Sequence, residues 1–225
     1  MTILMQKEFE KLKKGILTLS ALVEESVNRS VKAVMERNEG LAKSVIESDN
    51  EIDSMEIDVE EECLKILALH QPVAADLRFI VAVLKINNDL ERVGDLAVNI
   101  CERALPLTRF PVLKAPFGLP EMGQKVRLMV KKSLDALVNV DEDAAEEVCR
   151  MDDDVDNINR DMYAKVTEHL QAKPQDAEAL LHLLSISRQL ERIGDHATNI
   201  AQDVIYLIRG EIIRHQGLDS SSEAQ

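Results

Sequence analysis

The sequence predicts an all-α protein made of two tandem three-helix bundles related by internal duplication. Its 225 residues include only 8 glycines and 6 prolines, roughly half of the ~12% found in average proteins, and 3% aromatic residues. This composition disfavours sandwiches and barrels, which need turn residues every ~10 positions. Apolar residues reach 45%, which is enough to fill a core and excludes a wholly disordered chain.

Each half is predicted to contain three long helices joined by short connections. In the first half, the helices cover roughly residues 6–37, 40–70 and 72–104. Pro72 suits the first position of the third helix, because its missing N–H would have no partner there. Since short connections make successive long helices antiparallel neighbours, the three helices should form a bundle.

Four prolines between residues 106 and 120 mark the one evident linker, because each removes a backbone donor and restricts the residue before it. The second half repeats the helix breaks of the first, near residues 139–141 and at Pro174. The predicted domains are therefore a first bundle at 1–105, a Pro-rich linker at 106–120, a second bundle at 121–214 and a disordered tail at 215–225 that lacks apolar periodicity.

Matching segments reveal the duplication. Asp49–Asp53 aligns with Asp152–Asp156 at an offset of 103 residues. Leu90–Ile100 aligns with Leu190–Ile200 at an offset of 100, and eight of these eleven residues are identical. The change of offset indicates a net loss of three residues in the second copy, near the junction of its second and third helices.

The charge balance restricts the partners of this chain. With 41 acidic and 27 basic residues, the net charge of -14 repels a phosphate backbone and gives no attraction to anionic lipids. We expect no nucleic-acid binding, no direct membrane insertion, and partners that are proteins, cations or basic surfaces. Three well-separated cysteines and the lack of a signal-peptide pattern indicate a cytoplasmic protein.

Acidic residues one helical turn apart recur in the third helix of each half. Glu91, Asp95 and Asn99 stack at i, i+4 and i+8 and should point away from the apolar seam of their helix. The second half repeats them as Glu191, Asp195 and Asn199. Like charges at this spacing destabilise an isolated helix, and the glycine before each aspartate costs about 1 kcal/mol relative to alanine. A cation between the carboxylates would explain why both unfavourable features recur, since it converts repulsion into coordination.

The preceding helix of each half carries a second acidic pair. These pairs are Asp49 with Asp53, and Asp152 with Asp156, again spaced i, i+4. If antiparallel packing brings the pairs together, each bundle presents four carboxylates on one patch. Donor sets of oxygen alone suit Mg²⁺, Ca²⁺, Mn²⁺ or iron rather than tetrahedral zinc. Spacing alone leaves open that these are ordinary solvated acidic faces and that the glycines merely permit close helix approach.

Motifs for enzymatic chemistry are missing from the sequence. None of the five histidines completes a Glu-x-x-His motif, and there is no GxxxxGK[ST] or GxGxxG loop. We therefore predict no catalytic residues. Two alternatives stay open: a phosphohydrolase that uses clustered metals to activate water, and a helical scaffold whose carboxylates merely keep it in solution.

The sequence resembles the PhoU family. The resemblance rests on Leu69-His-Gln-Pro-Val-Ala-Ala-Asp-Leu-Arg78, on Asn88-Asp-Leu-Glu-Arg-Val-Gly-Asp95 and on the second Leu-Glu-Arg-Ile-Gly-Asp segment, and it covers nearly the whole chain. It implies tandem three-helix bundles that bind multinuclear metal ions through paired E(D)xxxD motifs. Carried over by position, the ligands are Asp49, Asp53, Glu91, Asp95, Asp152, Asp156, Glu191 and Asp195; iron, Zn, Mn and Mg are the candidate metals.

The resemblance also implies a function. PhoU-like proteins are negative regulators of phosphate uptake and of phosphate-starvation signalling. They act as adaptors between the ATPase subunit of a phosphate ABC transporter and a phosphate-responsive sensor histidine kinase, and we expect a homodimer. The repeat is imperfect at Asp89 against Gln189 and at Leu96 against His196, so the second site is expected to differ from the first in occupancy or metal preference.

Overall fold

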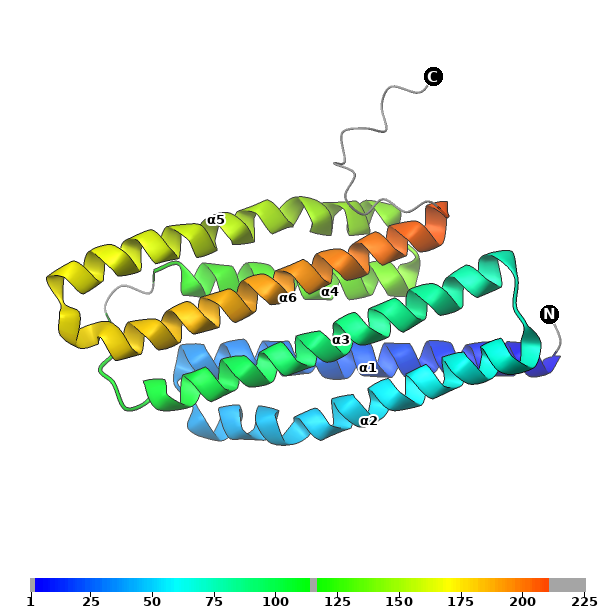
Figure 1. The fold of residues 1–225 in the computed structure, drawn as a ribbon, viewed down its shortest axis with the longest axis horizontal. Helices are drawn as coiled ribbons and strands as arrows, with labels where there is room; N and C mark the ends of the chain where they lie inside the picture. Colours follow the sequence, from blue (N-terminus) through cyan, green and yellow to red (C-terminus); the bar gives the residue numbers. More distant parts are fainter. Residues whose placement is uncertain (1–2, 114–116, 211–225) are drawn as a thin grey trace, which may run out of the picture.

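The computed structural model describes residues 3–113 and 117–210, and within them it confirms two tandem three-helix bundles. The first bundle consists of α1 (Ile3–Glu36), α2 (Glu39–His70) and α3 (Ala74–Leu107). The second consists of α4 (Leu119–Asn139), α5 (Glu142–Ala172) and α6 (Ala177–Arg209), with a short 3₁₀ turn, η1 (Pro174–Asp176), before α6. Figure 1 shows the helices lying roughly along the long axis of the molecule. The predicted tail lies outside the described residues.

Equivalent side chains start the second helix of each bundle. The Asn38 Oδ1 accepts a hydrogen bond of 3.0 Å from the backbone N–H of Leu41 at the start of α2. Asp141, which is its counterpart in the repeat, accepts one of 3.0 Å from the N–H of Ala144 at the start of α5. Each bond satisfies one of the free N–H groups in the first helical turn. The duplication therefore extends to the residues that define the helix ends.

Two prolines lie differently from our expectation. Pro72 precedes α3 rather than starting it, because Val73 is extended (φ -128°, ψ 161°) and the helix begins at Ala74. Pro106, predicted to open the linker, lies inside the last turn of α3, which continues to Leu107. A proline this close to a helix end removes only one backbone bond and leaves few turns to disrupt. The helix boundaries thus shift by two or three residues at both ends of α3.

The two bundles share one hydrophobic core. The most extensive helix–helix contact joins α3 to α6, and α1 also contacts α4. Figure 1 shows α3 and α6 side by side between the other helices. Fully buried residues of both halves, such as Leu90 and Leu190, belong to a single apolar cluster. Within the described residues, no helix has a run of apolar residues long enough to cross a membrane.

Polar contacts cross the interface between α3 and α6. His196 Nδ1 lies 2.8 Å from Asp89 Oδ1, and Asn199 Nδ2 donates to the same oxygen at 3.4 Å. Further along, Lys85 pairs with Asp203 at 3.3 Å. Asp89 and His196 are two positions where the repeat is imperfect. Their divergence from Gln189 and Leu96 therefore serves the contact between the bundles.

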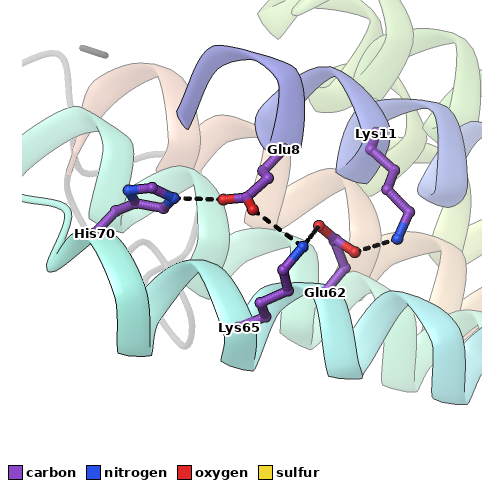
Figure 2. Close-up of polar contacts among 5 residues, drawn as sticks. All are labelled: Glu8, Lys11, Glu62, Lys65 and His70. Atoms are coloured by element: carbon purple, nitrogen blue, oxygen red, sulfur yellow. Dashed lines mark hydrogen bonds and ion pairs between the residues drawn. The ribbon is translucent and has the colours of Figure 1, made fainter. Parts of the chain in front are cut away.

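A second polar network joins α1 to the end of α2 (Figure 2). Lys65 lies 3.0 Å from Glu8 and 3.3 Å from Glu62, while His70 contacts Glu8 and Lys11 contacts Glu62. Glu8 and Glu62 are both buried. Because buried carboxylates are costly unless they are paired, the lysines and His70 allow α1 to pack on α2 here.

The cysteines behave as apolar core residues. Cys63 and Cys101 are buried, and burial raises the pKa of both thiols to about 12. The pKa of Cys149 is raised to about 11 by the same cause, with further contributions from Asp152 and Glu146. Since the thiolate is the reactive form, these raised pKa values disfavour thiol reactivity at neutral pH.

Candidate functional site

The first acidic cluster lies where α2 and α3 approach each other at Gly94. A Cβ on Gly94 would lie 3.2 Å from the Ile52 Cγ2 and 3.4 Å from the Asp49 Oδ1. The missing side chain therefore lets the backbone of α3 come close to α2 at the turn that carries Asp49. This contact brings Asp49 and Asp53 of α2 near Glu91 and Asp95 of α3, a convergence that spacing alone could only assume.

The cluster is less exposed than the helical wheel indicated. The side chain of Glu91 is 24% exposed and that of Asp95 is 44% exposed, although the sequence predicted an outward-facing stripe. The helical wheel placed these residues opposite the seam of α3, but it did not include α2, which covers this flank. Asp49 and Glu91 are therefore half-buried at the contact between α2 and α3, whereas Asp53 is exposed.

The carboxylates of the first cluster raise each other's pKa. Burial raises the pKa of Asp49 to about 6, and the negative charges of Asp53 and Asp95 add to this rise. Burial also raises the pKa of Glu91, with Asp95 again contributing. Removing a carboxylate from water and placing it near like charges both disfavour its ionised form. The cluster thus carries charge that the protein itself does not fully neutralise.

Two oxygens of this cluster accept no hydrogen bond although they are buried: Asp49 Oδ1 and Glu91 Oε2. Arg92 forms ion pairs with this cluster: its Nε lies 3.4 Å from Glu91 Oε2, and its guanidinium also lies 3.4 Å from Asp95. Because Arg92 is half exposed, these ion pairs are weak. Arg92 thus pairs with both of its acidic neighbours on α3.

The second cluster repeats this arrangement on α5 and α6. A Cβ on Gly194 would lie 3.7 Å from the Asp152 Oδ1 and 3.6 Å from Val155. Although Asp195 is exposed, local burial raises its pKa to about 6, and Glu191, Asp152 and Asp156 each add to this rise. The pKa of Asp152 is raised by burial and then by Asp156. Carboxylates from both helices therefore interact in the second bundle as well.

The asparagines predicted alongside each stripe do not join the clusters in the same way. Asn99 is exposed, whereas Asn199 is half-buried and donates to Asp89 of the other bundle. Sequence reasoning missed Glu56 and Asn87, which lie one turn beyond the predicted residues of the first cluster. Their signal was present, because Glu56 follows Asp53 by three residues and Asn87 precedes Glu91 by four.

The chemistry of these residues fits a hard cation. Each cluster offers four carboxylates, and in both a glycine of one helix lies close to an aspartate of the other. In the first cluster, two buried carboxylate oxygens also lack hydrogen bonds. Across residues 3–113 and 117–210, no three His, Cys, Asp or Glu side chains already stand in a geometry that could hold a metal ion. Metal binding therefore requires the carboxylates to rotate toward a common point, and the eight predicted ligands stay a prediction.

A duplicated six-helix fold with one carboxylate cluster per bundle defines a class of all-α proteins made of two equivalent domains. The family model described as "PhoU domain" matches residues 16–104 and again residues 119–204. The chain belongs to the PhoU family.

Several relatives match almost the whole chain. The phosphate-specific transport system accessory protein PhoU homolog of Pseudomonas putida is 40% identical over 214 residues, which cover 94% of this chain and 83% of that protein. The homolog of Aquifex aeolicus is 37% identical, with 96% and 98% covered. The crystal structure of PhoU from Pseudomonas aeruginosa superposes with a TM-score of 0.89 at 37% identity, covering 92% of this chain and 99% of that chain.

Proposed function

We propose that this chain is a negative regulator of phosphate uptake and of phosphate-starvation signalling. It acts in the cytoplasm, as a homodimer, and serves as an adaptor between the ATPase subunit of a phosphate ABC transporter and a phosphate-responsive sensor histidine kinase. Relatives that match nearly the whole of this chain are named phosphate-specific transport system accessory proteins, which supports a role beside such a transporter. The net charge of -14 favours protein partners with basic surfaces.

The single observation that carries the proposal is the doubled carboxylate cluster. The metal ions would be held in the first bundle by Asp49, Asp53, Glu91 and Asp95, and in the second by Asp152, Asp156, Glu191 and Asp195. A bound cation would supply positive charge that offsets the repulsion between these carboxylates. The residues of this chain then contribute rigidity, because α2 is linked to α3, and α5 to α6, through one shared centre. A rigid interhelical surface is what an adaptor needs to bind two partners in a defined orientation.

Affinity capture tests the adaptor role. The full chain, loaded with Mn²⁺ or treated with chelator, is used to capture the purified transporter ATPase and the kinase, with and without phosphate. We expect retention of both partners, loss of retention when Asp95 and Asp195 are both changed to Asn, and unchanged retention for Glu51→Gln, an exposed acid on α2. No retention of either partner, together with unchanged reporter output after gene deletion, would reject the proposal. Light scattering at micromolar concentration tests the homodimer.

One observation favours a second candidate function, a metal-dependent phosphohydrolase. That observation is the grouping of acidic residues from two helices in each bundle, since clustered metal ions held by carboxylates can activate water. Turnover of a generic phosphate ester by the Mn²⁺-loaded protein, abolished by Asp95→Asn and Asp195→Asn, would favour the enzyme over the adaptor. A scaffold without metal sites predicts neither turnover nor bound metal after purification without chelator.

A further inference from the structure

An open groove of about 840 Å³ lies between α1 and α2 of the first bundle. Leu12 and Val59 are buried at its floor, and Leu64 of α2, which also lines it, is 53% exposed. A Cβ on Gly15 would lie 3.1 Å from the Val59 Cγ2, so the missing side chain lets the two helices approach and leaves the floor open. The groove is therefore apolar at its base and accessible from outside.

The two walls of this groove carry opposite charges that the chain does not pair. Lys14 lies on the α1 wall, and Asp58 and Glu61 lie on the α2 wall; all three are exposed. Within residues 3–113 and 117–210, the side chains of these three residues form no ion pair or hydrogen bond. The neighbouring Lys11 instead contacts Glu62 of α2 (Figure 2). Both walls thus offer free charge to an occupant of the groove.

The repeat does not reproduce the walls of this groove in the second bundle. At the offset of 103 residues, Leu119, where α4 begins, aligns with Ile16, so most of the α1 wall has no helical counterpart. On the other side, Leu64 aligns with Thr167, whose hydroxyl donates to the backbone oxygen of Tyr163. A three-helix bundle of this kind therefore does not require an exposed leucine here, which points to a role in binding.

The length and chemistry of the groove fit a helix. Its lining residues extend from Lys11 to Thr18 on α1 and from Met55 to Lys65 on α2, which is about 10–15 Å along the helices and accommodates about two to three helical turns. An added β-strand would find no backbone partners, because the N–H groups of both helices are bonded within the helices. A small ligand needs polar groups that converge, whereas here opposite charges lie on opposite walls.

We propose that this groove docks a short amphipathic helix of a partner protein. The apolar stripe of that helix packs on the floor and on Leu64, its acidic flank faces Lys14, and its basic flank faces the acids of α2. Complementary charges on both flanks select such a helix over one with flanks of a single sign. None of the eight predicted metal ligands lines the groove, so this docking goes beyond the proposed function and requires no bound metal.

Fluorescence anisotropy with a stapled helical peptide tests the docking. The labelled peptide has about three turns, with leucines on one face, glutamates along one flank and lysines along the other, and the full chain is titrated into it at physiological ionic strength. We expect saturable binding that Leu64→Ser weakens about tenfold. Thr18→Trp should abolish binding, because it places a large side chain in the groove. Ile57→Ser, which changes an equally exposed residue of α2 outside the groove, should leave binding unchanged.

Charge variants test the two flanks separately from the apolar contact. Lys14→Glu should weaken the mixed peptide about fivefold, and more at low salt, because salt screens exposed charges. Peptides whose flanks are both acidic or both basic should bind about tenfold more weakly than the mixed peptide, since each meets one wall of like charge.

No saturable binding of the mixed peptide, or equal weakening by Leu64→Ser and Ile57→Ser, would overturn the proposal. A wild-type dimer that Leu64→Ser converts to a monomer in light scattering would overturn it as well, because a second copy of the chain would then fill the groove. A small apolar dye that binds the wild type but not Leu64→Ser, and that the peptide does not displace, would assign the groove to a small ligand instead.

Discussion

Gly94 and Gly194 occupy the same position in two copies of one repeat, yet their surroundings differ. At Gly94 the Ile52 methyl carbons lie 3.2 and 3.3 Å from the position of a Cβ, whereas the nearest atom at Gly194 is 3.6 Å away. The first bundle is therefore tighter at its cluster, where Asp49 Oδ1 and Glu91 Oε2 are buried without a hydrogen bond. In the second cluster, the Thr198 side chain acts on Asp152 as a hydrogen-bond partner that lowers its pKa, against the larger effect of burial.

The N-terminal ends of the bundles differ in a second way. Helix α1 spans 34 residues and α4 only 21, so the first turns of α1 have no counterpart in the second half. Those turns carry Glu8 and Lys11, which form the polar network with the end of α2 (Figure 2). Duplication thus kept the residues around each cluster and let the periphery diverge. The comparison predicts that both clusters bind the same kind of cation but differ in occupancy or in metal preference.

The largest expected effect comes from removing carboxylates from one half at a time. Asp49→Asn with Asp95→Asn should abolish Mn²⁺ binding in the first bundle, and Asp152→Asn with Asp195→Asn should abolish it in the second. Each double variant should bind Mn²⁺ at its altered cluster with an affinity lower by about 100-fold or more, because an amide is a neutral and weaker ligand than a carboxylate. Elemental analysis after dialysis counts the metal that remains. Complete loss of metal from both bundles after either double change would show that the clusters are one site.

Replacing Gly94 or Gly194 with alanine should change the free energy of unfolding by different amounts. Gly194→Ala gains helix propensity of about 1 kcal/mol with room for its methyl group. Gly94→Ala gains the same amount but presses on Ile52, which is buried and stiff at χ1, so overpacking costs about 1–3 kcal/mol. Urea denaturation should therefore find Gly94→Ala about 1–3 kcal/mol less stable than Gly194→Ala. Equal urea midpoints for the two variants would contradict a tighter contact at Gly94 than at Gly194.

The raised pKa values of two carboxyl groups predict how the stability of the metal-free protein depends on pH. Because Asp49 and Asp195 have folded-state pKa values of about 6, the folded chain retains protons between pH 4 and 6 that the unfolded chain has released. Their contribution to stability is present at low pH and is lost as pH rises through 6. We expect Tm to fall by about 2–4 °C more between pH 5 and 7 than in the Asp49→Asn, Asp195→Asn double variant.

Saturating Mn²⁺ serves as the check on this pH effect. A cation compensates the ionised carboxylates, so the extra fall in Tm of the wild type should disappear when metal is present. A wild type and double variant with parallel pH profiles in chelator would contradict the raised pKa values.

The smallest expected effect concerns the interface between the bundles. Asp89→Asn removes a charge that His196 and Asn199 contact, but the amide oxygen can still accept a hydrogen bond. We expect a loss of about 1 kcal/mol in urea denaturation. Asp154→Asn, which removes an exposed acid paired with Lys125, should cost less than about 0.5 kcal/mol. A change at Asp89 no larger than at Asp154 would show that the contact contributes little.

Much of this architecture could be predicted from sequence because it follows from local rules. Low glycine and proline content, the 103-residue offset and the helix breaks near residues 38–40 and 139–141 indicate the number and order of the helices. The exact ends of α3 could not be predicted, since Val73 and Pro106 adopt conformations that depend on the neighbouring chain. Boundaries of this kind are set by packing as much as by propensity.

The geometry of the candidate site could not be predicted from sequence. Spacing nominated the eight acidic residues as metal ligands, which stays a prediction, and it left a close helix approach open as the alternative reading of the two glycines. The half-buried state of Glu91 required knowledge of where α2 lies against α3. The roles of Asp89 and His196 also depended on tertiary structure, because the repeat alone could not show that two imperfect positions meet each other across the bundles.

Anomalous diffraction from crystals soaked in Mn²⁺ tests the central claim most directly. Metal binding by both clusters predicts anomalous peaks between Asp49 and Asp95 and between Asp152 and Asp195. Carboxylate pairs that hold only water at saturating Mn²⁺, with their side chains still apart, would contradict it.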